Sequence, residues 1–311
     1  MKYYVTVDGG TTNTRVNLVC DGKVVTSEKI SIGARDCIDG NSKLKDTITE
    51  KIDYICLQNS IKTEDLTAII ASGMITCEYG LFTLPHLSAP VGIKELNAGI
   101  GVARGMLGGL DCHFIPGVKI KTDSPLSTDM MRGEETEIMG IYSPELENSV
   151  FILPGSHSKH IFLGKDGRIA SFKTMMTGEM ISALANGTIL KGVIKLDLTS
   201  FDPTSLLQGY DASEALGLND ALFKVRIMKN LFNKSDTECY SFFLGAVMHD
   251  EVSALKKASV ERAVIGGKGQ LRESLAHLLR ERTSLNVLTL DDKIVENSVA
   301  LGAVKIFEFN S

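Results

Sequence analysis

The sequence predicts an α/β protein built from two similar domains, each with a mixed sheet flanked by helices. Apolar runs typical of strands alternate with helical patterns along most of the chain. One strand–loop–strand pattern occurs twice, at residues 3–25 and 148–170. At 311 residues, the chain is also long enough for two domains of ordinary size.

The repeat is visible when Gly22 is aligned with Gly167, because 167 − 22 gives one offset of 145 residues. Gly10 then aligns with Gly155, and each is followed by a hydroxyl residue. Both copies continue into an Asp-Gly dipeptide, which is a strong signal for a tight hairpin turn. Unrelated β-meanders can look alike, but the glycine, the hydroxyl and the turn agree at one offset. The repeat therefore favours two similar domains that face each other.

The remaining elements follow in order. In the first half, the patterns predict a helix around 48–56, a strand over 66–71, a helix over 93–107, a strand over 112–115 and a helix over 133–141. In the second half, they predict helices over 203–216, 220–231, 237–257, 271–279 and 294–307, with strands over 263–265 and 285–290. Pro144 and nearby charges interrupt the pattern, so we expect domains of residues 1–145 and 146–311.

The charge and the cysteines exclude several classes of protein. Lys and Arg number 33 and Asp and Glu 38, which gives a net charge of −5 without a basic run and argues against nucleic-acid binding. The six cysteines form no CxxC pair and no zinc spacing, as is typical of reduced thiols. No apolar run reaches the about 18–20 residues that span a membrane. We therefore expect a cytoplasmic protein with no membrane partner.

The loop after the first strand, Asp-Gly-Gly-Thr-Thr-Asn, has the residues that bind phosphate. Gly9 and Gly10 allow the backbone to approach an anion closely. Backbone N–H groups and the hydroxyls of Thr11 and Thr12 can donate hydrogen bonds to phosphoryl oxygens. Asp8, at the end of the strand, is a candidate for holding Mg²⁺ through water, because this ion loses its water reluctantly.

The second copy has the matching loop Gly-Ser-His-Ser-Lys, in which the candidate phosphate-binding residues are Gly155, Ser156, His157 and Lys159. Either loop alone also fits an ordinary β-turn. Their shared offset favours two loops that hold one nucleoside triphosphate between the domains. His157 and His160 lie on opposite faces of a hairpin, which excludes a metal pair.

A third glycine loop lies between a predicted strand and a predicted helix. Gly266 and Gly267 suit the adenosine or α-phosphate end of a nucleotide. The loop lacks the spacing of a Walker A motif and of a dinucleotide fingerprint.

Arg132 and neighbouring acids stand at a predicted helix start, and they allow two interpretations. Acids in a first turn, here Glu134 and Glu135, commonly complement the helix dipole. Alternatively, a carboxylate is the general base and the arginine orients the substrate of a kinase, in which positioning provides most of the catalysis. The residues alone leave both interpretations open. Glu179, after Thr177-Gly178, is likewise a first-turn acid that follows a cap.

These motifs together resemble the 2-dehydro-3-deoxygalactonokinase family of the sugar kinase, actin and heat-shock ATPase superfamily. The resemblance runs in the same order over nearly the whole chain. It rests on Asp8–Asn13 with Arg15, Gly73-Met74, Met131–Thr136, Leu153–Lys159, Met176–Glu179 and Phe223–Arg226. It implies two actin-like, ribonuclease H-like domains that close on a nucleotide in the cleft between them.

The resemblance also implies an activity: phosphorylation of the 6-hydroxyl of 2-dehydro-3-deoxy-galactonate, dependent on ATP and Mg²⁺, giving the 6-phosphate and ADP in galactonate catabolism. The partners would be the sugar acid and ATP, and a homodimer is compatible. The chain departs from the family pattern where the family usually has tryptophan or Gly-Ser, namely at Gly9, Thr76, Cys77, Leu81 and His160. These departures leave a related 2-keto-3-deoxy sugar acid as an alternative substrate.

The resemblance then gives the candidate residues their roles. The catalytic residues that we expect are Glu134 as base, Asp8 with the metal and Arg15 for charge stabilisation, with Glu135 and Asp129 as alternative bases. The substrate-binding residues that we expect are Arg132, Glu135, Thr76 and Glu179. Either arginine could bind the substrate carboxylate in a bidentate geometry.

Two other functions stay open at this stage. A hexose or N-acetylhexosamine kinase of the same superfamily would not need an arginine for a carboxylate. A non-catalytic sugar sensor or actin-like assembly protein would not need the acids at Asp8 and Glu134.

Overall fold

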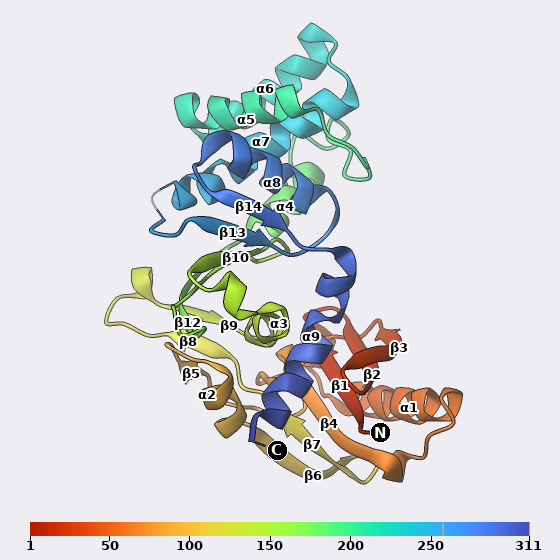
Figure 1. Ribbon diagram of the computed structural model, residues 1–311. Helices are drawn as coiled ribbons and strands as arrows, with labels where there is room; N and C mark the ends of the chain where they lie inside the picture. The colour runs from red at the N-terminus through yellow and green to blue at the C-terminus, as the bar shows by residue number, and fades with distance from the viewer. Residues whose placement is uncertain (257, 311) are drawn as a thin grey trace. The chain divides into compact units, whose positions relative to one another are not determined.

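The computed structural model describes residues 1–256 and 258–310, which form two compact units (Figure 1). Unit 1 consists of Met1–Glu147, Leu163–Phe172 and the chain from Lys293 onward, and unit 2 consists of Asn148–Phe162 and Lys173–Asp292. The sheets and flanking helices confirm the predicted α/β class. The sequence placed a single boundary at 145, whereas segments 163–172 and 293 onward group with the first unit.

Unit 1 contains a six-stranded mixed sheet in the order β3-β2-β1-β4-β7-β6. Its strands are β1 (Tyr3–Gly9), β2 (Thr14–Cys20), β3 (Lys23–Ile30), β4 (Leu66–Gly73), β6 (Gly101–Leu107) and β7 (Leu110–Phe114). Strand β1 pairs antiparallel with β2 and parallel with β4. The first hairpin therefore forms as the sequence predicts, and its loop connects the two antiparallel strands.

Helices cover both faces of this sheet. Helix α1 (Ser42–Gln58) buries Ile48, Ile52 and Ile55, which share one helical face and belong to the same core as Val5 and Val7 of β1. On the opposite face, Phe307 of α9 (Asp292–Phe307) packs against the rings of Tyr4 and His113, with centroids 6.1 and 4.8 Å away. The alternation of side chains along β1 thus sends its residues into two helix contacts.

The predicted helix over 93–107 is wrong. Helix α2 covers only Ile93–Ala98, and β6 follows at Gly101–Leu107, paired antiparallel with β7. Gly99, Gly101 and Gly105 make a continuous helix unfavourable, and a Cβ at Gly101 would lie 2.7 Å from Phe82. Pairing with the next strand in a hairpin, closed by Gly108 and Gly109, decides the structure here.

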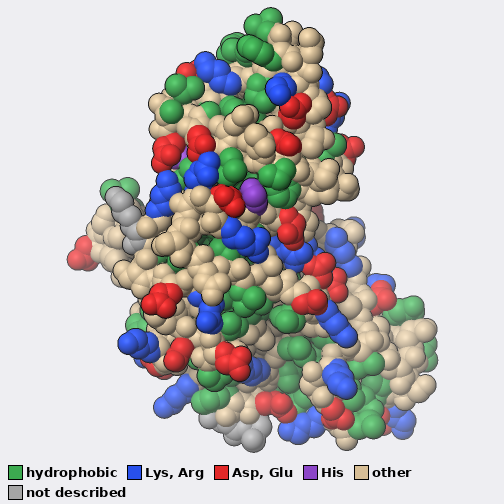
Figure 2. All heavy atoms as spheres, turned by 45° about the horizontal axis from the view of Figure 1, so that its top comes forward, with side chains coloured by type: hydrophobic (Ala, Val, Ile, Leu, Met, Phe, Trp, Pro, Cys, Tyr) green, Lys and Arg blue, Asp and Glu red, His purple; other side chains and the backbone are tan. Residues whose placement is uncertain are grey.

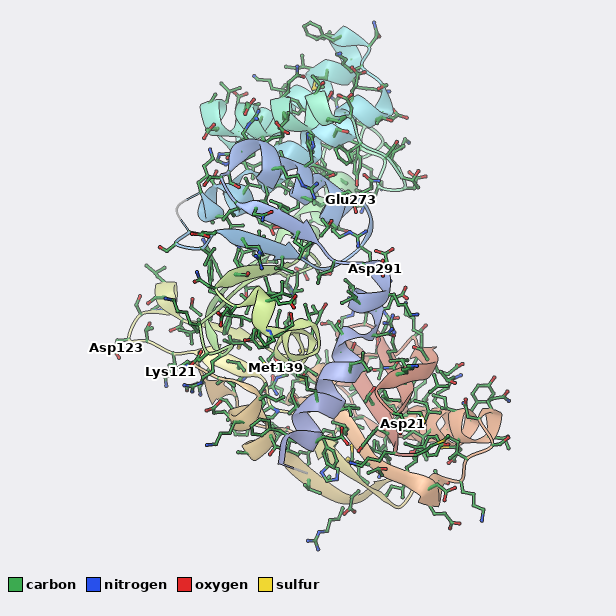
Figure 3. The ribbon with its side chains drawn as sticks, in the orientation of Figure 1. Asp21, Lys121, Asp123, Met139, Glu273 and Asp291 are labelled. Carbon is green, nitrogen blue, oxygen red and sulfur yellow. The ribbon has the colours of Figure 1, made fainter. Side chains whose placement is uncertain are left out.

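A small three-stranded sheet was not predicted. It joins β5 (Leu87–Ser88), β8 (Val118–Ile120) and β9 (Asp129–Met131), and β9 leads into α3 (Glu134–Ile141). Lys121 and Asp123 lie on the loop between β8 and β9 (Figure 3). These strands are too short to show a periodic pattern in the sequence.

A second sheet has five strands in the order β12-β11-β10-β13-β14, so β12-β11-β10-β13 repeats the arrangement of β3-β2-β1-β4. It belongs to unit 2 apart from Leu163 and the part of β12 up to Phe172, which group with unit 1. Its strands are β10 (Ser149–Leu153), β11 (Ser158–Leu163), β12 (Ile169–Met175), β13 (Arg262–Ile265) and β14 (Asn286–Thr289). β10 pairs antiparallel with β11 and parallel with β13, as β1 does with β2 and β4. The duplication read from the sequence is therefore present in the sheets.

The helices of unit 2 are α4 (Thr177–Gly187), α5 (Pro203–Leu216), α6 (Leu218–Phe232), α7 (Asp236–Leu255) and α8 (Gly269–Arg282). They match the predicted helices to within a few residues, except that Lys257 lies outside the described residues. Helix α7 is buried along most of its length. It packs so closely on α5 that a Cβ at Gly245 would lie 1.9 Å from the carbonyl oxygen of Leu206. Glycine at this position makes the approach possible.

The surface agrees with the composition. On the face drawn in Figure 2, acidic and basic side chains are interspersed rather than gathered by sign. No helix within 1–256 or 258–310 is long and apolar enough to cross a bilayer.

Candidate functional site

In unit 1, three glycines bring the ends of β1 and β4 against the start of α3. A Cβ at Gly73, which has φ +82°, would lie 2.4 Å from the carbonyl oxygen of Gly9. A Cβ at Gly133, which has φ +114°, would lie 3.2 Å from the Cα of Gly73. Only glycine fits this conformation and this spacing. The contact places Asp8, at the end of β1, near the acidic first turn of α3.

Three carboxylates interact at this point: Asp8, Glu134 and Glu137. Burial raises the pKa of Asp8 to about 6, with Arg15 opposing and Glu134 reinforcing the shift. Burial raises the pKa of Glu137 to about 8, and the charges of Asp8 and Glu134 add to it while a hydrogen bond with Ser298 opposes it. Like charges held together raise each other's pKa, as is common where a cation or substrate binds.

Sequence reasoning missed Glu137. Its spacing of three residues from Glu134 places both on one face of α3, and this was the available signal. The relation of Glu137 to Asp8 depends on how α3 packs, which the sequence does not contain.

These groups fit Mg²⁺ held mainly by water and phosphate. Within residues 1–256 and 258–310, no cluster of three or more His, Cys, Asp or Glu side chains could hold a metal. Mg²⁺ commonly binds one or two carboxylates and keeps several waters, so Asp8 and Glu137 suffice. Ser72, which pairs with Asp8 across β1 and β4, has a buried hydroxyl without a hydrogen-bond partner among these described residues.

The two glutamates at the start of α3 have local backbone partners. Glu134 accepts a hydrogen bond from the backbone N–H of Arg132 at 3.0 Å. Glu135 accepts two from the N–H of Gly133, at 2.8 and 2.9 Å, and it is fully buried. Burial raises the pKa of Glu135 to about 8, and the charge of Glu134 adds to it. Glu135 thus caps the helix and cannot touch a ligand in this conformation, whereas Glu134 is only partly buried.

Arg132 and Thr76 bind each other. Arg132 Nη1 donates to the carbonyl oxygen and the Oγ1 of Thr76, at 2.8 and 2.5 Å. Arg132 Nη2 contacts the carbonyl oxygen of Leu84 and Nδ1 of His86, at 3.1 and 3.2 Å. Thr76 is fully buried and also donates to the carbonyl oxygen of Gly73 at 3.0 Å. Both predicted substrate-binding side chains therefore brace the loop 74–86.

The other candidates of unit 1 lie around the first loop. The N–H of Gly10 donates to the carbonyl oxygen of Asn13 at 2.8 Å, and Thr11 and Thr12 are exposed. The segment after β3 supports this loop, because a Cβ at Gly33 would lie 2.4 Å from the backbone of Thr11. Two further candidates lie on strands: exposed Arg15 opposes Asp8 across β1 and β2, and Asp129 lies in the small sheet on β9.

In unit 2, the second loop packs on the start of α4. A Cβ at Gly178 would lie 2.3 Å from the carbonyl oxygen of Gly155. The N–H of Glu179 donates to the carbonyl oxygen of Ser156 at 3.2 Å, and its carboxylate lies 3.2 Å from Nε2 of His157. Glu179 therefore belongs beside the second loop. Lys159 follows on β11, and its side chain is buried.

The third glycine loop lies beside the second. The N–H of Gly266 donates to the carbonyl oxygen of Ile152 at 2.8 Å. A Cβ at Gly267, which has φ +68°, would lie 3.0 Å from the carbonyl oxygen of Pro154. The structure thus brings Gly155, Gly178 and Gly267 together from three separate segments of unit 2.

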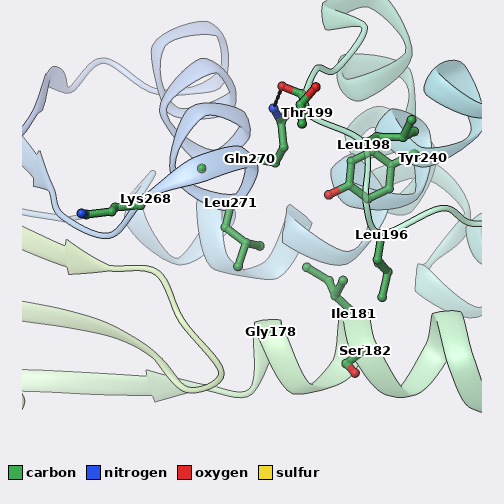
Figure 4. A pocket seen from close by; sticks show the side chains of 11 residues that line it. Gly178, Ile181, Ser182, Leu196, Leu198, Thr199, Tyr240, Lys268, Gln270 and Leu271 are labelled. Carbon is green, nitrogen blue, oxygen red and sulfur yellow. Dashed lines mark hydrogen bonds between the residues drawn. The ribbon is translucent and has the colours of Figure 1, made fainter. Parts of the chain in front are cut away.

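A cavity of about 500 Å³ opens next to these loops (Figure 4). Its lining combines apolar and polar residues. These are Gly178, Ile181, Ser182, Leu196, Leu198, Thr199, Tyr240, Lys268, Gly269, Gln270 and Leu271. Gln270 Nε2 donates to the carbonyl oxygen of Thr199, and Gln270 Oε1 has no partner within the part of the chain that the structure describes. A largely apolar space with a few polar groups suits a ring system that hydrogen-bonds at its edge.

Sequence reasoning named two glycines near this cavity but not its lining. The lining residues come from α4, from segment 196–199, from α7 and from the start of α8. In the sequence each is an ordinary core or loop residue, so only their assembly identifies the cavity.

Comparison with known proteins gives a family. The sequence profile described as 2-keto-3-deoxy-galactonokinase matches residues 8–301. A Rhizobium meliloti protein named "Probable 2-dehydro-3-deoxygalactonokinase DgoK1" is 26% identical over 322 aligned positions, which cover 98% of each chain.

Two solved structures are similar in fold. A crystal structure of "a putative 2-dehydro-3-deoxygalactonokinase protein from Sinorhizobium meliloti" has a TM-score of 0.79 and 22% identity, covering 98% of this chain and 99% of that one. The activator of 2-hydroxyisocaproyl-CoA dehydratase from Clostridium difficile, with bound ADPNP, has a TM-score of 0.54 and 16% identity, covering 99% and 95%.

Proposed function

This chain belongs to the 2-keto-3-deoxy-galactonokinase family, and we propose that it transfers the γ-phosphoryl group of ATP to the 6-hydroxyl of 2-dehydro-3-deoxy-galactonate. It is a sugar kinase, an enzyme that transfers a phosphoryl group to an alcohol. The products of the proposed reaction are the 6-phosphate and ADP, and its place is galactonate catabolism. The observation that carries the proposal is the family match over residues 8–301, which includes every candidate loop.

We assign the nucleotide to the glycine loops and the cavity of unit 2. The cavity takes the adenosine, with Tyr240 and the aliphatic side chains against the base and Gln270 available at its edge. Gly266 and Gly267 hold the nucleotide near its α-phosphate, and Gly155, Ser156 and His157 bind phosphoryl oxygens. The activator with a similar fold was solved with bound ADPNP, which is consistent with nucleotide binding by this fold.

We assign the phosphoryl transfer to the carboxylates of unit 1 and to its first loop. Thr11 and Thr12 donate hydrogen bonds to the phosphoryl group, and Gly9 and Gly10 let the backbone of this loop approach it closely. Asp8 and Glu137 hold Mg²⁺, which when bound would neutralise charge on the phosphates.

Acceptor chemistry requires a base and a positive charge. Glu134, which is partly buried whereas its neighbour Glu135 is fully buried, accepts the proton of the 6-hydroxyl. Arg15 remains the candidate for the substrate carboxylate, because the guanidinium of Arg132 is already bound to Thr76, Leu84 and His86. Thr76 and Arg132 then act by holding the loop near Asp8.

All six cysteines are free thiols, which agrees with the proposed cytoplasmic location.

A coupled assay of ADP release over a panel of acceptors tests the function. We expect the highest kcat/KM with 2-dehydro-3-deoxy-galactonate, lower values with other 2-keto-3-deoxy sugar acids, and none with neutral aldoses. Turnover of glucose or N-acetylhexosamines without turnover of the acids would contradict the substrate. Absence of ADP release with every acceptor would contradict the catalytic role.

A further inference from the structure

A buried carboxylate in unit 2 contacts both segments that border the second phosphate loop. Glu251 of α7 accepts a hydrogen bond through Oε1 from the hydroxyl of Ser158, the first residue of β11. Through Oε2 it accepts one from Thr177, the first residue of α4, at 2.5 Å. His160 Nε2 lies 3.2 Å from Oε1 and donates to it, because an ionised carboxylate can only accept. The loop 155–157 and its support on α4 are thus tied to one side chain.

This carboxylate is ionised despite its burial. Glu251 is 2% exposed, and Ser158, His160 and Thr177 are 7% exposed or less. Burial acts to raise the pKa of Glu251, but hydrogen bonds from His160, Ser158 and Thr177 together hold it below its ordinary value. A buried charge needs its donors, so removing one leaves a strained and partly unsatisfied group. The network therefore fixes the relative positions of β11, α4 and α7.

We propose that Glu251 is a positioning residue that holds the second phosphate loop in its nucleotide-binding geometry. This inference rests on the proposed function, because it requires that loop to bind the triphosphate. Ser158 is the residue at which the loop ends, and Thr177 precedes the Gly178 and Glu179 on which the loop packs. A shift of either border moves the loop's donors, and donor position decides how well phosphoryl oxygens are bound.

Three variants remove or change the contacts one at a time. Ser158→Ala and Thr177→Val delete the two hydroxyls, and Glu251→Gln keeps the shape but removes the charge. Thr177→Ser is the conservative rescue, since it keeps a hydroxyl at the same place. Ser213→Ala is the matched control: Ser213 is also buried in unit 2, and its hydroxyl donates to the carbonyl oxygen of Ala246 at 3.0 Å, between α5 and α7.

The measurements are the Kd of ATP by calorimetry on the full chain, the KM of the sugar acid, and the melting temperature. We expect Ser158→Ala, Thr177→Val and Glu251→Gln each to raise the Kd of ATP about tenfold, the scale of one lost hydrogen bond to a charged group, with the KM of the sugar acid unchanged. Thr177→Ser restores the Kd. Ser213→Ala lowers the melting temperature by a similar amount but leaves the Kd unchanged.

Two results would overturn the inference in different ways. If the unmodified chain binds ATP and the three variants match Ser213→Ala in Kd, the network only stabilises the fold and the positioning role is wrong. If the unmodified chain binds no ATP, the proposed function fails and the inference fails with it.

Discussion

At the scale of single residues, the acids of α3 divide into one with local backbone partners and two that interact with Asp8. Glu135 is buried against the N–H of Gly133 and caps the helix. Glu134 and Glu137 lie on one face of α3. Asp8 of β1 is close enough for its charge to interact with both. Neighbouring glutamates with similar sequence contexts thus have different surroundings, because the helix turns each in a different direction.

This division predicts different defects for two similar variants. Glu134→Gln should lower kcat by about 10²–10⁴ with little change in ATP affinity, because a lost base affects proton transfer. Glu137→Gln should instead raise the Mg²⁺ concentration needed for half-maximal rate. Titrations of rate against Mg²⁺ distinguish the two, with the exposed Glu64→Gln as control. Near-normal turnover in Glu134→Gln would remove that residue from the role of base.

His86 gives a prediction for pH. Burial, with the charges of Arg132 and Lys119, lowers the pKa of His86 to about 4 from its ordinary 6.5. The unfolded chain therefore binds this proton at a higher pH than the folded chain, so the contribution of His86 is complete above pH 6.5 and is lost as pH falls toward 4.

Urea denaturation between pH 7 and pH 4.5 measures this contribution. The variant His86→Asn keeps an acceptor for Arg132 but does not titrate. We expect the unmodified chain to lose more stability than His86→Asn as pH falls, and parallel pH profiles would contradict the assignment.

At the scale of elements, α9 completes a domain that begins about 290 residues earlier. Phe307 packs on Tyr4 and His113, and Glu308 accepts hydrogen bonds from the Tyr4 hydroxyl at 2.6 Å and from Lys2 at 2.8 Å. One face of the first sheet is therefore covered by the end of the chain.

This packing predicts that Phe307→Ala lowers the free energy of unfolding by about 2–3 kcal/mol, somewhat less than for a fully buried ring. Phe309→Ala, two residues on and 43% exposed, is the control and should change stability by less than about 0.5 kcal/mol. Urea denaturation provides both values. Equal effects of the two substitutions would show that α9 does not support the sheet through Phe307.

The elements also show how far the sequence can be read. The two hairpins were predictable because their Asp-Gly turns and alternating strands are local signals. The strand β6 was not, because pairing with β7 overrides the apolar pattern that favoured a helix. The placement of α9 was missed for the same reason: its helical pattern gives its existence but not the sheet that it covers.

The site follows the same rule. Asp8, the two hairpin loops and Gly266-Gly267 were named from the sequence, since loops rich in glycine and hydroxyls have a direct chemical meaning. Glu137, Glu251 and Tyr240 were not, because only their contacts with residues distant in the sequence make them candidates. The hydrogen bonds of Arg132 with Thr76 and His86 could not be predicted either, because they depend on how β9 packs.

At the scale of the whole molecule, the two units have separate cores and separate candidate sites, so each ligand should leave its own signature. Hydrogen exchange on the full chain measures this. A ligand that binds only the folded state raises the free energy of opening at its site by RT ln(1 + [L]/Kd), and exchange there slows. We expect ADP without acceptor to protect 155–159, 177–182 and 266–271 of unit 2, which border the cavity and its loops. We expect the sugar acid alone to protect 8–15 and 132–138 of unit 1. Glucose at the same concentration is the control and should protect neither set. Protection of unit 1 alone by ADP would contradict the assignment of adenosine to the cavity beside Tyr240 while leaving the kinase activity itself untouched.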